Sequence, residues 1–157
     1  MTMKSLMAAI ALAAAISQPA MAKGAVPVPF WGTYVSSENS GGGTFPVFVQ
    51  VLKGRGQATY LTRFTIEAEW RVNVETLDAV GTFTLTAANG DTLVGTATGK
   101  AVVIGEFAYI TETCFITGGT GRFVDAKGGF VTARVLALAP GSTEQSEASF
   151  HGTITLR

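Results

Sequence analysis

Apolar and polar residues alternate along most of the chain, with the period of two that is typical of β-strands. The alternation is clearest over residues 64–74, where one face carries only apolar residues and the other only polar ones. The apolar set is Phe64, Ile66, Ala68, Trp70, Val72 and Val74. A helix would mix the two sets, whereas a strand separates them. Similar patterns predict strands over residues 45–52, 57–63, 80–87, 91–98, 107–117, 129–139 and 146–156.

Turn-forming residues separate most of these segments. Asn89-Gly90 predicts a type I′ hairpin turn, since that turn needs two central residues that tolerate positive φ. Glycine or proline clusters at 53–56, 118–121 and 140–141 predict further chain reversals. No long stretch after residue 22 has a helical period, so we expect at most one helical turn, near residues 122–126. Residues 36–43 contain three consecutive glycines and predict a mobile loop.

The fold class that follows is all-β, a single eight-stranded antiparallel barrel over residues 45–157. Closure into a barrel removes the exposed sheet edges that eight short strands would otherwise leave. Residues 23–44 are predicted to be an extended N-terminal arm followed by the Gly-rich loop. A barrel of eight strands has an interior just wide enough for side chains or one small ligand.

The first 22 residues have the pattern of a cleaved signal peptide. Lys4 supplies the positive charge, residues 5–17 are rich in Ala, Leu and Ile, and Ala20-Met21-Ala22 fits the cleavage motif. The apolar stretch is shorter than the roughly 20 residues of a membrane-spanning helix. We therefore expect export to the periplasm or the extracellular space and no transmembrane segment after processing.

Composition narrows the function classes. Eleven basic residues balance eleven acidic ones, so no basic face indicates a nucleic-acid partner. One Cys and one His are too few for a structural zinc site or a disulfide framework. We expect no metal and no cofactor.

The segment 116–128 reads Ile-Thr-Gly-Gly-Thr-Gly-Arg-Phe-Val-Asp-Ala-Lys-Gly. It resembles the signature of the allene oxide cyclase and dirigent barrels. Residues 111–113 and 83–96 resemble the corresponding parts of bacterial exported members, so the resemblance spans most of residues 57–156. It implies an eight-stranded barrel with an apolar cavity, often assembled into oligomers such as dimers or trimers. We carry no catalytic residue over from the family, and fold alone does not define function.

The glycines of this signature also have a physical interpretation. Gly118, Gly119 and Gly121 allow a sharp reversal with backbone angles that other residues avoid. Phe123 follows them and is expected to plug the end of the barrel.

Four polar or aromatic residues are candidates for ligand binding: Tyr60, Trp70, Glu112 and Arg134. Glu112 shares a strand face with aliphatic residues. If that face lines the interior, burial would raise its pKa and suit it to proton transfer, which makes it the candidate catalytic residue. An inward Arg134 would pair with Glu112 or bind a carboxylate ligand. Facing outward, both would be surface or subunit-contact residues. Tyr60 and Trp70 are in phase with one apolar face, where they are either core or ligand-contacting.

Two other reactive side chains have simpler interpretations. His151 is out of phase with its apolar neighbours and is expected on the surface. Cys114 is interpreted as a small buried hydrophobe. No local motif supports a Cys–His nucleophilic pair.

Four function hypotheses remain open from the sequence. The first is an exported barrel that binds a small hydrophobic molecule in its lumen. The second is a cofactor-independent cyclase or isomerase, or a stereochemical guide, acting on an unsaturated apolar substrate. The third is a non-catalytic structural module that forms homo-oligomers. The fourth is an outer-membrane barrel, which the absence of aromatic girdles and of a terminal aromatic residue disfavours.

Overall fold

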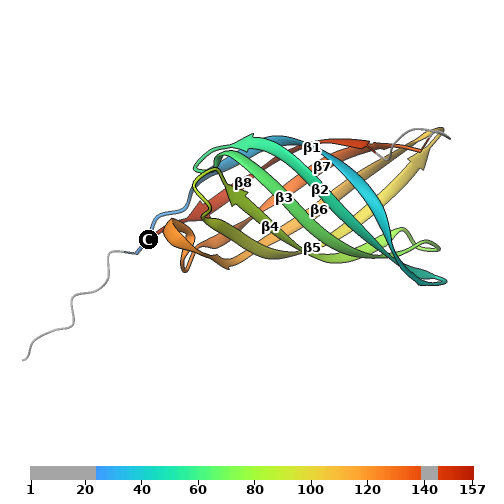
Figure 1. The fold of residues 1–157 in the computed structure, drawn as a ribbon, viewed down its shortest axis with the longest axis horizontal. Helices are drawn as coiled ribbons and strands as arrows, with labels where there is room; N and C mark the ends of the chain where they lie inside the picture. Colours follow the sequence, from blue (N-terminus) through green and yellow to red (C-terminus); the bar gives the residue numbers. More distant parts are fainter. Residues whose placement is uncertain (1–23, 139–144) are drawn as a thin grey trace, which may run out of the picture.

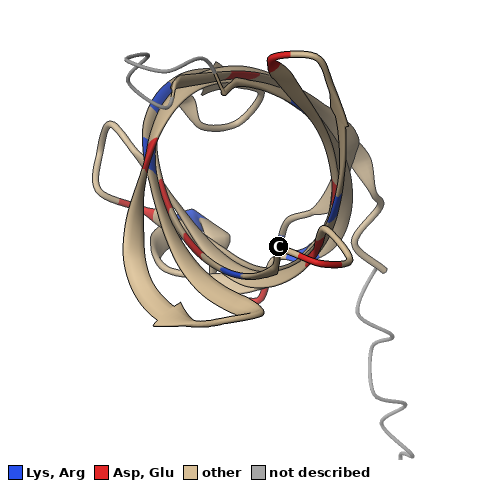
Figure 2. Cartoon of the chain, turned by 90° about the vertical axis from the view of Figure 1, so that its right-hand side faces the viewer, with Lys and Arg blue, Asp and Glu red and all other residues tan. Residues whose placement is uncertain are grey.

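The eight strands close into one antiparallel barrel in which every strand pairs with its neighbours in sequence and β1 pairs with β8 (Figure 1). The computed structural model describes residues 24–138 and 145–157. The strands are β1 (Val28–Thr44), β2 (Val47–Ala58), β3 (Thr62–Asn73), β4 (Asp78–Ala87), β5 (Thr92–Ile104), β6 (Phe107–Gly119), β7 (Lys127–Ala137) and β8 (Gln145–Thr155). Viewed along the barrel, they form a continuous ring (Figure 2). The predicted signal peptide, residues 1–22, lies outside the described residues.

The prediction of an all-β, eight-stranded antiparallel barrel is confirmed. The alternation read from the sequence separates the inside of the barrel from the outside. On β3, Phe64, Ile66 and Trp70 are buried, while Glu67 and Glu69 between them are exposed. Val74 lies beyond the end of this strand and is exposed. Within the described ranges, no helix is long and apolar enough to cross a membrane.

The prediction of an arm and mobile loop over residues 23–44 is wrong for most of that segment. Residues Val28–Thr44 form β1, the longest strand of the barrel. Phe30, Tyr34 and Glu38 point inward from it and are buried. The period of two was present in this segment, but its inward positions include glycine, serine and glutamate, so hydrophobicity alone did not reveal it.

The glycines at 53–56 do not interrupt β2, contrary to the sequence prediction. A Cβ atom on Gly54 would lie 2.5 Å from the Val35 carbonyl oxygen, and one on Gly56 would lie 2.1 Å from the Thr33 carbonyl oxygen. Both positions therefore need glycine because β1 passes too close for any side chain. Here glycine marks a close approach of two strands rather than a turn.

The chain reverses instead at residues 59–61, which joins β2 to β3. Tyr60 and Thr62 adopt positive φ values of 63° and 56°. This turn interrupts the alternation that placed Tyr60 on the same face as Trp70 in the sequence analysis. As a result, Tyr60 leaves the inward face and is 38% exposed.

The hairpin between β4 and β5 also differs from the prediction. Gly90 has a φ of 90°, but Asn89 does not have a positive φ, so the turn is not type I′. The Gly90 amide donates to the Ala87 carbonyl and the Ala87 amide to the Asp91 carbonyl, both at 2.9 Å. This is a three-residue loop in which the glycine takes the left-handed position.

One end of the barrel is closed by the segment between β6 and β7, which we call the closed end. It contains a single 3-10 turn, η1 (Gly121–Phe123), near the predicted helical turn. Phe123 is fully buried there, so the expectation that it plugs the barrel is confirmed. Gly121 has a φ of 57°, and a Cβ on Gly119 would lie 2.0 Å from the Thr92 carbonyl oxygen. The glycine signature thus lets the plug fold over β5.

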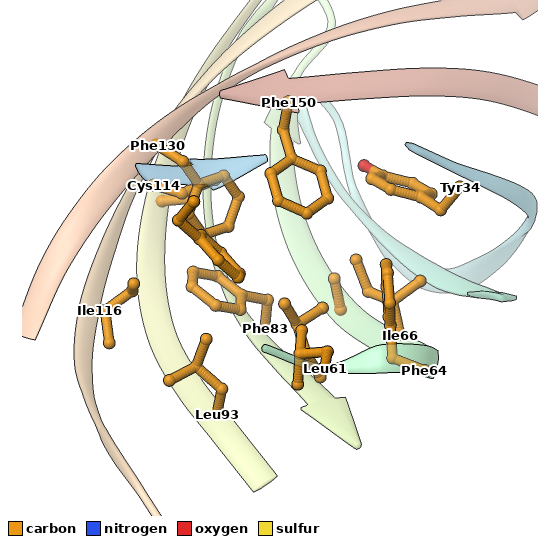
Figure 3. Packing of buried hydrophobic residues seen from close by; sticks show 14 of the residues in the cluster. Tyr34, Leu61, Phe64, Ile66, Phe83, Leu93, Cys114, Ile116, Phe130 and Phe150 are labelled. Carbon is orange, nitrogen blue, oxygen red and sulfur yellow. The ribbon is translucent and has the colours of Figure 1, made fainter. Parts of the chain in front are cut away.

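Aromatic side chains fill the interior next to this plug (Figure 3). Phe130 lies at the centre of the cluster, with ring centroids 4.9 Å from Phe150, 5.4 Å from Phe83 and 5.5 Å from Phe30. These tilted and edge-to-face arrangements are the favourable ones for aromatic pairs. An internal void beside them has a volume of about 10 Å³, which is about the space of one water molecule. This half of the lumen is therefore packed with side chains.

Replacing Phe123 with alanine is expected to lower the free energy of unfolding by about 3–5 kcal/mol, because it removes a fully buried ring from the barrel end. Chemical denaturation of the purified protein measures the change. Val124→Ala is the matched control, since Val124 is 50% exposed on the next position. Equal losses in the two variants would contradict the role of Phe123 as the plug.

Candidate functional site

The opposite end of the barrel, which we call the open end, contains a cavity of about 290 Å³. This is the end where hairpins join β1 to β2, β3 to β4 and β5 to β6 (Figure 1, right-hand side). Much of the cavity wall is apolar and comes from Val72, Leu77, Ala79, Val103, Ile110 and Leu136. Larger hollows elsewhere are shallow depressions involving outward-facing side chains such as Val35 and Arg55.

The cavity exists because small residues occupy inward positions at this end. Ala79, Gly99, Ala101 and Ala108 line it from three consecutive strands. At the closed end, the corresponding space holds phenylalanine rings. The size of the inward side chains therefore divides the lumen into a packed half and a hollow half.

The floor of the cavity is formed by an ion pair between Glu112 on β6 and Arg134 on β7. The Arg134 Nε and Nη2 atoms both donate to Glu112 Oε1, at 3.0 and 2.7 Å. In the antiparallel register Glu112 lies opposite Thr132, so Arg134 is its diagonal neighbour on the same face. Glu112 is 2% exposed and Arg134 4%. The inward orientation that the sequence left open is thus the correct one for both residues.

A second carboxylate completes this charge cluster. Glu38, on β1, pairs with Arg134 Nη1 and is itself buried. Arg134 Nη1 also donates to Ser146 Oγ at 3.4 Å, and Ser146 Oγ lies 2.7 Å from Ser36 Oγ. Ser36 and Ser146 are opposite each other in the β1–β8 register. Two carboxylates therefore share one guanidinium, and most of its donors are already in use.

Burial raises the pKa of Glu112 to about 8, with a hydrogen bond from Tyr34 opposing part of this shift. The physical cause is the cost of keeping a charge in a poorly solvated interior. One guanidinium cannot neutralise two ionised carboxylates, so retaining one proton on the cluster is the favourable state at neutral pH. Because the groups interact strongly, that proton belongs to the cluster as a whole.

Two further ionisable groups face the cluster and stay neutral. Burial raises the pKa of Tyr34, and the nearby Glu112 charge adds to the effect. The pKa of the Cys114 thiol rises to about 12, again mainly through burial. A thiol with such a pKa carries almost no thiolate and is a poor nucleophile. Cys114 is buried, as the sequence indicated, and His151 is exposed.

Three buried polar atoms of residues that line the cavity have no hydrogen-bond partner in the described part of the chain: Nε1 of Trp70, Oε1 of Gln50 and Oε1 of Glu38. Of these, Glu38 Oε1 is ion-paired with Arg134. Trp70 and Gln50 are directly opposite each other in the β2–β3 register. Buried polar groups are nearly always hydrogen-bonded, to protein, water or ligand. This donor and this acceptor can both hydrogen-bond to a polar group placed in the cavity.

The structure brings together three of the four residues singled out from the sequence. Trp70, Glu112 and Arg134 all line the cavity. The placement of Tyr60 in a ligand site is wrong, because the turn at residues 59–61 puts it on the surface of the closed end.

Sequence reasoning missed Tyr34, Glu38, Gln50 and Ser146. Two of these, Tyr34 and Glu38, lie on β1, whose polar inward positions hid the period of two. The signal that would have found Tyr34 and Glu38 is the spacing of two that they share with the buried Phe30.

Comparison with known proteins yields no relative. A scan against protein-family models, a search of curated proteins and a search of solved structures each found no match. Within residues 24–138 and 145–157, no three His, Cys, Asp or Glu side chains come together in a way that would hold a metal ion.

The raised pKa of Glu112 predicts a pH-dependent stability. Folding retains a proton that the unfolded chain loses near the ordinary pKa of 4.5. This contribution is complete below pH 4.5 and disappears as the pH rises through about 8, with a slope of at most about 1.4 kcal/mol per pH unit. Denaturant unfolding between pH 5 and 9 should show the free energy of unfolding falling relative to that of Glu112→Gln. Parallel curves for the two proteins would contradict a raised pKa.

Arg134→Met is expected to lower the free energy of unfolding by about 3–5 kcal/mol near pH 8, because it leaves two carboxylates buried without a counter-charge. Adding Glu38→Gln and Glu112→Gln to the same chain should restore part of this loss. Arg71→Met, on the exposed face of β3, is the control. A triple variant no more stable than Arg134→Met would show that lost packing, not charge, explains the effect.

Proposed function

We propose that this protein binds a small, largely apolar molecule with a polar head group in the cavity at its open end. The observation that supports this best is the combination of apolar walls with a buried polar floor. The Trp70 and Gln50 atoms without partners add a donor and an acceptor at one side. Small-molecule sites have this composition, in which apolar surface provides affinity and a few polar groups fix orientation.

The size of the cavity limits the ligand. About 290 Å³ is at the lower end of the range for small-molecule pockets, roughly 300–1,000 Å³. The void among the aromatic rings of the packed half is only about 10 Å³, so the ligand occupies the open end rather than the whole barrel. A compact ring system or a short chain fits these dimensions, whereas a long acyl chain does not.

The location we propose is the periplasm or the extracellular space, on the basis of the N-terminal sequence pattern. The outer face of β3 supports a barrel surrounded by water, since Arg63, Glu67, Glu69 and Arg71 are all exposed there. A charged residue facing lipid costs about 2–4 kcal/mol at the bilayer midplane for Arg or Lys. This argues against the outer-membrane alternative.

A second candidate function is cofactor-independent proton transfer, as in an isomerase or cyclase. The observation in its favour is Glu112, a carboxyl group with a pKa of about 8 at the floor of the cavity. A group that titrates near neutral pH can both donate and accept a proton. Turnover of unsaturated or epoxide substrates by the native protein, lost in Glu112→Gln, would favour this candidate over simple binding.

A third candidate, a structural module that forms homo-oligomers, has support from the outer surface of β6 and β7. Tyr109, Phe115, Val131 and Val135 are exposed there, between 37% and 54%. Light scattering on the purified protein would detect such an assembly. An oligomer is compatible with ligand binding, because these side chains point away from the lumen.

Blocking the cavity is the direct test of ligand binding. Ala101→Phe places a ring into the cavity, whereas Val102→Phe places the same ring on the outer surface, where Val102 is 55% exposed. Native mass spectrometry of protein purified from its source should show a bound small molecule in the wild type and in Val102→Phe. The signal should fall at least about tenfold in Ala101→Phe.

Trp70 offers a second readout in solution. The chain has two tryptophans, and the other, Trp31, is exposed on the outside of β1. In a Trp31→Phe background, the fluorescence of Trp70 should change when a ligand enters the cavity.

For the cavity-blocking variants, equal retention of the native ligand by Ala101→Phe and Val102→Phe would contradict binding at the open end.

A further inference from the structure

The charge on the cavity floor indicates which head group the ligand carries. When both carboxylates are ionised, Glu38 and Glu112 outnumber the single guanidinium of Arg134 by one negative charge. All three side chains are at least nine-tenths buried. An uncompensated charge in such a place is costly, so the cluster needs either a proton or a cation.

Arg134 is not available to bind an anion. Its Nε and Nη2 atoms donate to Glu112, and its Nη1 atom contacts Glu38 and Ser146. The two carboxylates that flank it would repel a carboxylate ligand. The sequence-based hypothesis that Arg134 grips a carboxylate ligand therefore does not fit this geometry.

Two carboxylates and the Gln50 amide oxygen give the cavity floor several hydrogen-bond acceptors. Gln50 Oε1 has no hydrogen-bond partner in the described ranges, and the Glu38 and Glu112 carboxylates add further oxygen atoms. The donor without a partner is Trp70 Nε1, and Trp70 is 5% exposed. The indole ring of Trp70 also lines the cavity, and indole faces attract cations. Charge and hydrogen-bonding capacity thus point to the same kind of head group.

We infer that the ligand of this cavity is a small apolar amine, whose ammonium group binds at the Glu38–Arg134–Glu112 floor. This inference rests on the proposed function and specifies its ligand class. The ammonium group replaces the proton that the cluster otherwise holds, so that both carboxylates are ionised in the complex. The apolar body of the amine packs against Val72, Leu77 and Ile110.

The inference predicts proton release on binding. The ionisable groups that face Glu112 are Tyr34 and Glu38 on β1, Arg134 on β7 and Cys114 on its own strand. Tyr34 and Cys114 are kept neutral by burial, so the proton leaves from the carboxylates. On β5, Lys100 at the cavity rim is held by Asp78 at 2.9 Å and by the Thr76 carbonyl at 2.7 Å.

A matched set of three ligands tests the head group. Cyclohexylmethylamine, cyclohexylmethanol and cyclohexanecarboxylate share one ring and differ in charge. In calorimetric titrations of the wild-type protein at pH 8.5, the amine should bind at least about tenfold more tightly than the alcohol. The carboxylate should bind more weakly than the alcohol. An alcohol or carboxylate that binds as tightly as the amine would overturn the amine inference and leave the proposed function standing.

The pH profile of the wild-type protein gives an independent readout. The amine affinity should rise up to about tenfold per pH unit below pH 8, because binding displaces a proton. It should level off above pH 8 and fall again near pH 10, where alkylamines lose their own proton. The alcohol affinity should stay constant. Repeating the amine titration at pH 7 in two buffers of different ionisation enthalpy should show net proton release, and its absence would contradict the inference.

Glu112→Gln removes the surplus charge without changing the size of the side chain. In this variant the amine should bind no more tightly than the alcohol does. Glu147→Gln, on the exposed face of β8, is the matched control and should bind all three ligands normally. If none of the three ligands binds the wild type, and Ala101→Phe retains as much native ligand as Val102→Phe, the proposed function itself fails.

Discussion

The interaction on which the structure depends is the pairing of β1 with β8, which turns a sheet into a barrel. Ten residue pairs from Val28↔Ile154 to Ser37↔Gln145 form this closure. It brings the inward face of β1 opposite β6, β7 and β8, so that Glu38 reaches Arg134 and Ser36 meets Ser146. Without the closure, the polar residues of β1 would lie in solvent, and the charge cluster would not form.

The buried charge cluster supplies the polar floor of the cavity but stabilises the fold less than apolar side chains would. Burying two carboxylates and a guanidinium gains less stability than apolar packing of the same volume would. The barrel tolerates the cluster because Arg134 donates to Glu112 and to Ser146 and is ion-paired with Glu38, and because the raised pKa of Glu112 lets the cluster hold a proton. A proton held by the cluster offsets the surplus negative charge of the two carboxylates.

The division of the lumen follows from side-chain size. Phe83, Phe130 and Phe150 pack the half next to the Phe123 plug and give the barrel a rigid apolar core. At the open end, Gly99 and Ala101 leave space, and a Cβ on Gly99 would lie 3.6 Å from both Trp70 and Glu112. The packed aromatic core and the cavity therefore lie at different ends of one barrel. The charged floor of the cavity for this reason does not disrupt the aromatic packing.

The sequence by itself determined the strands whose inward residues are apolar, such as β3 and β4, and with them the barrel class, the Phe123 plug and the surface position of His151. It also identified Trp70, Glu112 and Arg134 as candidates. Only the tertiary structure decided that Glu112 and Arg134 face inward, that Glu38 joins them, and that Tyr60 does not. The reason is that hydrophobic periodicity records burial only where the buried side chains are apolar. In the sequence, a strand face with polar residues has the same pattern whether it lines the lumen or faces solvent. Only the closed sheet of the tertiary structure defines which face is inside.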